Sequence, residues 1–161
     1  MPTWLDDDEQ RVWRGYLAVS RRLPDAIARE TQEAGMPGAY YIIMAILSEA
    51  PGRQMRMSEL AERVSSSPSR ISHAVDRLAE RGWVRRERSE TDRRGNLAVL
   101  TEEGMAVVER AAPRHVRAVR ENLFDLLTRE QLAVLDEVFS AVLGRLDGTA
   151  SKGRAAPPCP P

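Results

Sequence analysis

The sequence has few of the side chains from which enzymes and metalloproteins build their sites. It contains one cysteine, Cys159, and two histidines, His73 and His115, which lie far apart in the chain. A structural zinc site takes four Cys or His ligands, usually in closely spaced pairs, and the sequence has no such pairs. Glycine-rich phosphate loops and serine nucleophile elbows are also missing. We therefore expect no catalytic residues, no metal and no cofactor.

Long hydrophobic runs are absent as well. No stretch approaches the roughly 20 apolar residues that a membrane-spanning helix needs. The first ten residues, MPTWLDDDEQ, are acidic and lack the basic and apolar regions of a signal peptide. These features predict a protein that has no membrane partner and is located in the cytoplasm.

Charge is balanced over the whole chain but is unevenly distributed. The 161 residues include 24 basic and 24 acidic side chains, and Lys152 is the only lysine. Residues 38–101 nevertheless hold 11 arginines against 8 acidic residues. Arginine binds phosphate through forked hydrogen bonds, so this segment is the candidate for nucleic-acid binding. An arginine-favouring base composition of the genome explains the use of arginine in place of lysine equally well.

The segment from Met57 to Thr101 predicts a helix, a tight turn, a second helix and two strands joined by a basic loop. We expect Ser58 to cap the first helix, which is short. A turn of three serines follows, and its last member, Ser67, is the predicted N-cap of a helix with Pro68 at its first position. That helix should extend to the residue before Gly82, which can adopt the left-handed conformation of a helix C-cap. A short helix, a tight turn and a longer helix form a helix-turn-helix signature.

The second helix has one apolar and one polar face. Its apolar residues recur at helical spacing and predict a buried stripe: Ile71, Ala74, Val75 and Leu78. The opposite face is rich in serine and arginine near the N-terminus, the end that a recognition helix presents to base edges in the major groove. The predicted DNA-binding residues of this helix are Ser67, Ser69, Arg70, Ser72, His73 and Arg77. The alternative is an ordinary amphipathic helix with a solvated face.

The two strands that follow predict a wing. The first begins at Trp83 and the second spans residues 97–100, and the loop between them is polar and basic. A wing in this position reaches toward the neighbouring minor groove, where arginine is favoured by the negative potential. The predicted DNA-binding residues of the wing are Arg86, Arg88, Asp92, Arg93 and Arg94. A solvated hairpin is the alternative.

The residues Asp92 to Thr101, DRRGNLAVLT, resemble the wing signature of the MarR family of transcriptional regulators. The elements that carry the resemblance are Asp92, Arg94 and the pair Leu100-Thr101, and the order of elements matches from residue 38 to residue 104. The resemblance implies a homodimer whose terminal helices interlock and whose winged domains bind DNA. It also implies that Arg94 enters the minor groove and that Asp92 holds its guanidinium in place.

The flanking segments are predicted to be helical. We expect a long helix over residues 6–33 with a kink at Pro24, an apolar helix over 39–50, and a short link over 53–57 that adds a strand beside the wing. A further helix should run from Thr101 to about residue 127. The last helix, after a Thr128-x-x-Gln131 capping box, has a heptad-like stripe of Leu132, Leu135, Phe139, Val142, Leu143 and Leu146.

These segments together predict the fold class and the domains. The fold is mainly α with a small β-hairpin: a winged helix-turn-helix with a helical dimerisation region. Residues 38–101 are the predicted DNA-binding domain, residues 1–37 and 102–147 the dimerisation region, and residues 148–161 a disordered tail. Apolar stripes on the first and last helices favour a homodimer.

The predicted function is that of a sequence-specific transcriptional regulator, a repressor that binds a palindromic operator in double-stranded DNA as a homodimer. A small aromatic or apolar effector is a candidate ligand. The residues proposed for its pocket are Trp13, Tyr16, Tyr40, Tyr41 and Met44. Plain core packing is the competing explanation for them. The competing function is a winged helix that contacts proteins and has no operator of its own.

Overall fold

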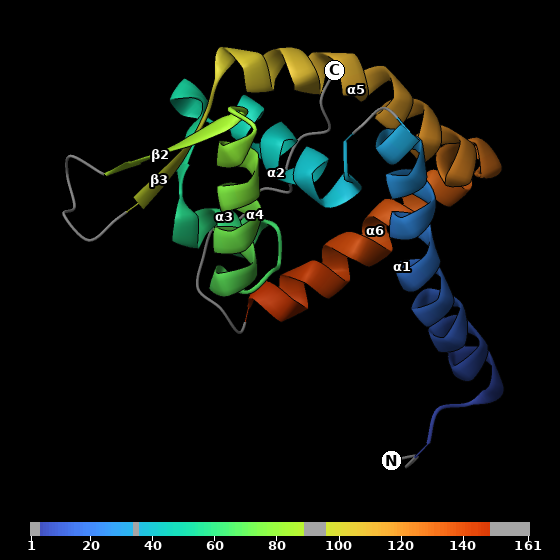
Figure 1. The fold of residues 1–161 in the computed structure, drawn as a ribbon. Helices are drawn as coiled ribbons and strands as arrows, with labels where there is room; N and C mark the ends of the chain where they lie inside the picture. The colour runs from blue at the N-terminus through green and yellow to red at the C-terminus, as the bar shows by residue number, and fades with distance from the viewer. Residues whose placement is uncertain (1–3, 34–35, 89–95, 149–161) are drawn as a thin grey trace.

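The computed structural model describes residues 4–33, 36–88 and 96–148, which form six α-helices, two 3-10 turns and three strands (Figure 1). In chain order these are α1 (Asp7–Glu33), α2 (Gly38–Glu49), η1 (Pro51–Arg53), β1 (Gln54–Arg56), α3 (Met57–Arg63), α4 (Pro68–Glu80), β2 (Val84–Arg88), β3 (Asn96–Leu100), α5 (Glu102–Asn122), η2 (Phe124–Leu126) and α6 (Arg129–Asp147). The mainly helical winged fold that the sequence predicts is confirmed.

Local side-chain chemistry determines where α4 begins and ends. The Ser67 hydroxyl accepts a hydrogen bond from the backbone N–H of Arg70 at 3.3 Å, and Pro68 occupies the first helical position. Gly82, two residues beyond the helix end, has a φ of +74°. Both predicted signals are therefore confirmed. The prediction for Ser58 is wrong, because α3 already begins at Met57 and its N-cap residue makes no side-chain cap bond.

The three strands form an antiparallel sheet in the order β1-β3-β2. β2 and β3 are the two strands of the wing, with Val84 opposite Leu100 and Arg88 opposite Asn96. β1 pairs with the other edge of β3, where Met55 lies opposite Ala98 and both are buried. The prediction of a short strand added beside the wing is confirmed.

Helix α2 supplies the centre of the hydrophobic core. Its residues Ile43, Met44 and Leu47 are almost completely buried. Apolar side chains from α3, α4, β2 and β3 belong to the same cluster, namely Leu60, Ile71, Val75, Leu78, Val84, Ala98 and Leu100. Helix α5 packs against both α2 and α1 and so connects the winged part to the long N-terminal helix (Figure 1).

Helix α5 is shorter than the sequence suggests. Thr101 caps its start by accepting from the N–H of Gly104 at 3.0 Å, but the helix ends at Asn122 and not near residue 127. The Asn122 side chain bonds back to the carbonyl of Ala118, and Arg120 forms an ion pair with Asp125 in the 3-10 turn that follows. A complete capping box at Thr128 and Gln131 then begins α6, as expected.

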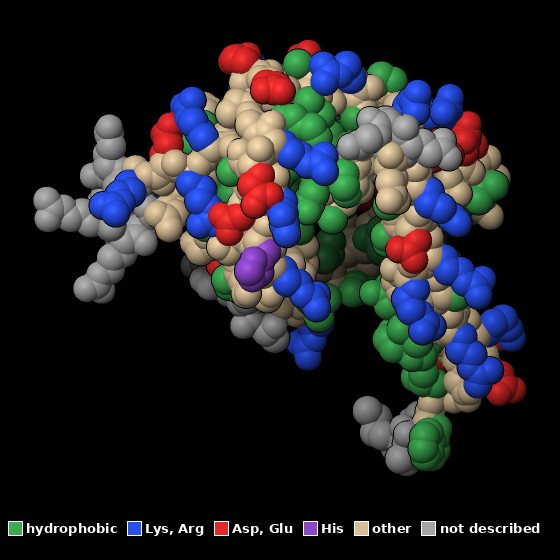
Figure 2. Space-filling model, in the orientation of Figure 1, with side chains coloured by type: hydrophobic (Ala, Val, Ile, Leu, Met, Phe, Trp, Pro, Cys, Tyr) green, Lys and Arg blue, Asp and Glu red, His purple; other side chains and the backbone are tan. Residues whose placement is uncertain are grey.

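Helix α6 has little contact with the rest of its own chain. Of its side chains that the structure describes, none is buried. Exposed large apolar residues gather on α6 and on α1, and they include Val12, Trp13, Tyr16, Val19, Val134, Val138, Phe139, Val142, Leu143 and Leu146. Figure 2 shows apolar side chains along the inner side of α1 and in the hollow between α1 and the winged part. Contiguous exposed apolar surface of this kind marks an interaction site.

His115 lies at the contact between α5 and α2. It lies on α5 with its ring packed on Tyr41 of α2, at 4.4 Å between ring centroids, and is partly buried. Desolvation by this burial lowers the pKa of His115 below the ordinary value of 6.5. The folded protein therefore holds His115 neutral at pH values where the unfolded chain protonates it.

We expect the free energy of unfolding to fall as the pH drops through 6.5, the ordinary histidine pKa. The stabilisation from neutral His115 is complete above that pH, and it is lost below it because the unfolded chain then binds the extra proton. Urea unfolding of the parent and of His115→Gln, at fixed protein concentration and several pH values, measures this contribution. His115→Gln should show a shallower loss of unfolding free energy at acidic pH than the parent. Parallel curves for parent and His115→Gln would contradict the assignment.

Candidate nucleic-acid interface

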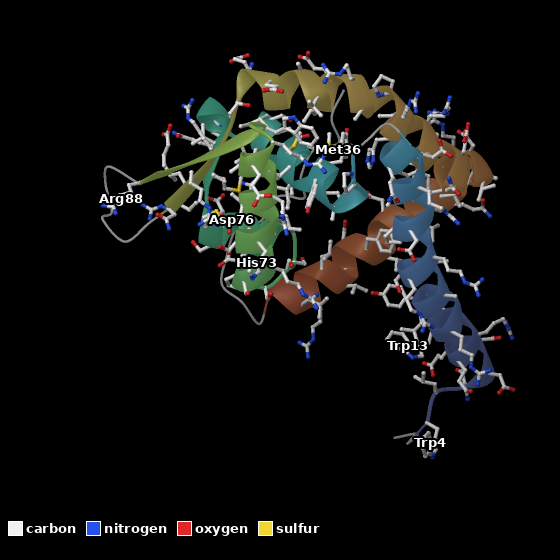
Figure 3. All side chains as sticks on the ribbon, viewed as in Figure 1. Trp4, Trp13, Met36, His73, Asp76 and Arg88 are labelled. Carbon is white, nitrogen blue, oxygen red and sulfur yellow. The ribbon has the colours of Figure 1, made fainter. Side chains whose placement is uncertain are left out.

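The N-terminal half of α4 presents a polar surface. Ser69, Arg70 and His73 are exposed there, and Figure 3 places His73 toward the N-terminal end of the helix. The apolar residues Ile71, Val75 and Leu78 are buried on the opposite side, which holds the helix against the core. The structure thus brings the predicted polar residues to one face, at the helix end that meets base edges in a recognition helix.

Two of the predicted α4 residues already have partners within the helix. The Ser67 hydroxyl is engaged in the cap described above. Arg77 donates to the carboxylate of Glu80 at 3.0 Å, and this hydrogen bond, together with the negative charge of Glu80, raises the pKa of Arg77. Arg77 stays charged in any case, so the consequence is geometric: its guanidinium is directed toward the C-terminal end of α4.

Arg86 of β2 points at the recognition helix. Its Nη2 donates to the carbonyl oxygen of Ser72 at 3.0 Å and to the Ser72 hydroxyl at 2.7 Å. The same atom lies 2.9 Å from Oδ1 of Asp76. By sequence, Arg86 is among the wing residues predicted to contact DNA. In the structure its guanidinium instead meets three acceptor atoms of two α4 residues, Ser72 and Asp76. This contact joins residues 14 apart in the chain, and no local sequence pattern indicates it.

The outer part of the wing holds the remaining predicted residues. Arg88, at the end of β2, is exposed, and Figure 3 shows it far out along the two strands. Asp92, Arg93 and Arg94 lie outside the residues that the structure describes, so their predicted roles stay predictions. On the neighbouring β2 positions, the guanidinium of Arg85 pairs with the carboxylate of Glu87.

The angle between wing and helices is set at the turn after α4. The Thr101 hydroxyl donates to the carbonyl of Gly82 at 2.7 Å, with the carbonyl of Trp83 at 3.1 Å, while the Thr101 N–H donates to Trp83 at 3.0 Å. The guanidinium of Arg81 stacks 4.9 Å from the ring centroid of Trp83. The end of α4, the start of β2 and the start of α5 therefore meet at Thr101.

Known proteins share both the sequence and this arrangement. A model of the MarR family matches residues 34–95. Sco3205, a MarR family transcriptional regulator from Streptomyces coelicolor, has a crystal structure in complex with DNA. Its sequence is 47% identical to this one and its structure matches with a TM-score of 0.85, over 91% of this chain and 92% of the Sco3205 chain. The chain belongs to the MarR family of transcriptional regulators.

Two further relatives extend the comparison. AbsC, a MarR family transcriptional regulator from Streptomyces coelicolor, is 41% identical with a TM-score of 0.85, over 91% of this chain and 99% of that chain. The transcriptional repressor MprA of Escherichia coli strain K12 is 25% identical over 119 residues, which is 74% of this chain and 67% of the relative. The family that the wing signature indicates is thereby confirmed.

In this MarR family chain, the five residues proposed for an effector pocket differ in burial. Tyr41 and Met44 belong to the buried core cluster, and Tyr41 packs on His115. Trp13 and Tyr16 stack on each other on α1, with ring centroids 5.5 Å apart, and are about half exposed. Tyr40 is partly buried. The pocket stays a prediction, and core packing stays the competing explanation for Tyr41 and Met44.

In the part of the chain that the structure describes, no group of three or more His, Cys, Asp or Glu side chains could hold a metal ion. Among the described helices, none has the length and apolarity that crossing a membrane requires.

Proposed function

We propose that this regulator binds double-stranded DNA through α4 and the wing. The observation that carries the proposal is that the N-terminal end of α4 is polar and exposed and lies beside a wing in which Arg88, at the end of β2, is also exposed. A relative with 47% identity over nearly the whole chain was crystallised in complex with DNA. By this proposal Ser69, Arg70 and His73 face the major groove, and Arg88, Arg93 and Arg94 face the adjacent minor groove and its phosphates.

The competing role, a winged helix for protein contact, needs an apolar docking surface on the same elements. Among the described residues of α4, β2 and β3, no large apolar side chain is exposed. Apart from Pro68 and Asn96, the exposed groups there are serine, histidine, arginine and acidic side chains. This composition suits a polyanion better than an apolar protein surface.

We further propose that the regulator acts as a homodimer held by α1 and α6. Most of the large apolar side chains that are exposed in the single chain lie on these two helices. A twofold axis would place two α4 helices on half-sites about one helical turn, roughly 10 bp, apart, so the operator should be an inverted repeat.

The proposed sign of regulation is repression, as the sequence predicts, and the relative MprA is named a transcriptional repressor. Release by an effector stays a prediction from the sequence.

Selection of bound sequences from a random duplex pool tests the proposal. The full chain should enrich an inverted repeat with half-site centres about 10 bp apart. Enrichment of a direct repeat would contradict the twofold arrangement. A pool that stays random after repeated rounds would contradict DNA recognition itself.

Arg70→Ala should weaken binding to the selected duplex by about 1–3 kcal/mol and flatten the preference at one base pair per half-site. Arg70 is exposed near the N-terminus of α4, where its fork can meet a guanine. Fluorescence anisotropy with the selected duplex, and with duplexes changed at single positions, measures both effects.

The matched control is Arg110→Ala, which removes the same charge from the exposed surface of α5. Figure 1 shows α5 on the opposite side of the molecule from the N-terminal end of α4. Arg110→Ala should bind like the parent. Equal losses in the two variants would show that total charge, and not readout by Arg70, accounts for the effect.

A further inference from the structure

A single guanidinium nitrogen of Arg86 makes the hydrogen bonds and the ion pair that join this side chain to α4. One nitrogen, Nη2, lies within 3.0 Å of three acceptors, the carbonyl and hydroxyl oxygens of Ser72 and the carboxylate of Asp76. That nitrogen carries two hydrogens, so the three acceptors share them. The Arg86 side chain is 32% exposed and Asp76 is 52% exposed, so the cluster lies at the edge of the surface that α4 presents.

The acceptors lie on the face of α4 that meets DNA in the proposed function. Ser69, Ser72 and Asp76 are three and four residues apart and form one stripe along the helix. An unpaired carboxylate at Asp76 would repel a nearby phosphate. Pairing with Arg86 compensates this charge without requiring Arg86 itself to contact DNA.

Arg86 also restricts the hydrogen-bonding role of Ser72. A serine hydroxyl can donate one hydrogen and accept others, and it rotates to suit its partners. Because the Ser72 hydroxyl accepts from Arg86 at 2.7 Å, and Arg86 has no acceptor to offer in return, the hydroxyl hydrogen remains to be donated to another acceptor. Its natural partners are acceptors on base edges in the major groove, such as N7 and O6 of guanine or O4 of thymine.

We propose that Arg86 is a positioning residue, which fastens the wing to the recognition helix and makes the Ser72 hydroxyl a hydrogen-bond donor toward an acceptor on a base edge. This inference rests on the proposed DNA binding and specifies how one residue of that surface is selective. It differs from the sequence prediction, in which Arg86 contacts DNA directly. The two roles predict different dependences on sequence and on salt.

The DNA experiment compares Arg86→Gln, Ser72→Ala, their double variant, and a charge-balanced pair, Arg86→Gln with Asp76→Asn. Arg85→Gln is the control, since it removes one charge from the next position of β2, where Arg85 is exposed and pairs with Glu87. Each protein is titrated with the selected duplex and with a scrambled duplex at several salt concentrations.

The positioning role predicts about tenfold weaker binding to the selected duplex for Ser72→Ala and for the charge-balanced pair, with binding to the scrambled duplex changed less than about twofold and the salt dependence of the parent retained. Arg86→Gln alone should also weaken binding to the scrambled duplex, because it leaves the carboxylate of Asp76 unpaired. The double variant of Arg86→Gln with Ser72→Ala should be no weaker than Arg86→Gln alone, because both changes remove the same donor.

A direct contact between Arg86 and a phosphate gives a different expectation. The charge-balanced pair would then bind both duplexes more weakly, and its log–log salt slope would become shallower by about one unit. That result would overturn the positioning role. Parent-like binding by Ser72→Ala would overturn the donor role.

A measurement without DNA separates this inference from the proposed function. Amide hydrogen exchange of β2 in the free protein should become about tenfold faster in Arg86→Gln, because the strand loses its attachment to α4. Arg85→Gln should exchange like the parent. Unchanged exchange in Arg86→Gln would overturn the attachment whatever the DNA results show. Faster exchange in a protein that selects no DNA would instead contradict the proposed function and leave the attachment standing.

Discussion

Replacing Gly104 with alanine should lower the free energy of unfolding by about 3 kcal/mol, near the upper end of the usual cost of overpacking. Gly104 lies in the first turn of α5, where the helix crosses the turn between α4 and β2. A Cβ atom at this position would be 2.1 Å from the carbonyl oxygen of Trp83 and 2.8 Å from Cδ1 of Leu100. The nearer atom belongs to the backbone, which cannot rotate away as a flexible side chain can.

The substitution should also disturb the bonds that hold this junction together. The N–H of Gly104 donates to the Thr101 hydroxyl, which in turn donates to the carbonyl of Gly82. Moving α5 away to admit a methyl group would stretch both bonds. A loss of this size is a large part of the about 5–15 kcal/mol by which domains are usually stable. Urea unfolding at fixed protein concentration measures it.

Gly144→Ala is the matched control for this prediction. Gly144 lies within α6, on the side away from its apolar stripe, and a Cβ there would have no atom within 4 Å. Alanine is favoured over glycine inside a helix by roughly 0.5–1 kcal/mol, so this variant should be slightly more stable than the parent. If Gly104→Ala and Gly144→Ala unfold at the same urea concentration, the close approach at Trp83 does not govern stability.

The features of this fold that the sequence predicts are those that depend on neighbouring residues. The capping of α4 by Ser67, the left-handed Gly82 and the Thr128–Gln131 capping box each lie within a few residues of the bonds they make. Such signals follow from side-chain and backbone chemistry alone. They place the recognition helix and the start of α6, and the wing signature after them indicates the family.

The features that the sequence does not predict join residues far apart in the chain. Arg86 meets Ser72 and Asp76, and the ring of His115 packs on Tyr41, only because the fold brings them together. Arginine in a basic strand has no local signal that separates a DNA contact from a bond to a neighbouring helix. The end of α5 is a local exception: Arg120 and Asp125 are five residues apart, but their ion pair belongs to the turn and not to the helical pattern.

The exposed apolar stripe of α6 gives the second prediction with a large expected effect. Leu143→Glu should convert the dimer to a monomer and weaken binding to the selected duplex by more than about a hundredfold. Leu143 is 50% exposed in the single chain, within the stripe that also contains Phe139 and Leu146. A glutamate in the middle of a helix–helix contact would bury an unpaired charge, which is among the costliest changes in an interface. A monomer would then bind one half-site without the second.

Two measurements on the same variant decide this prediction. Sedimentation of the parent should give about twice the 18.0 kDa chain mass, and Leu143→Glu should give the mass of one chain. Circular dichroism should show that the variant keeps its helices, because α6 contributes no described buried side chain to its own chain. Loss of DNA binding with retained helices would then reflect dissociation and not unfolding.

Ser140→Glu supplies the control, since it adds the same charge to α6 on the side away from the apolar stripe, where Ser140 is exposed. It should remain dimeric and bind DNA nearly as the parent does. If Leu143→Glu also stays dimeric and binds like the parent, the stripe on α6 does not hold the two chains together. If the parent itself sediments as a single chain, then two recognition helices are not joined by α1 and α6, and an inverted repeat loses its structural basis.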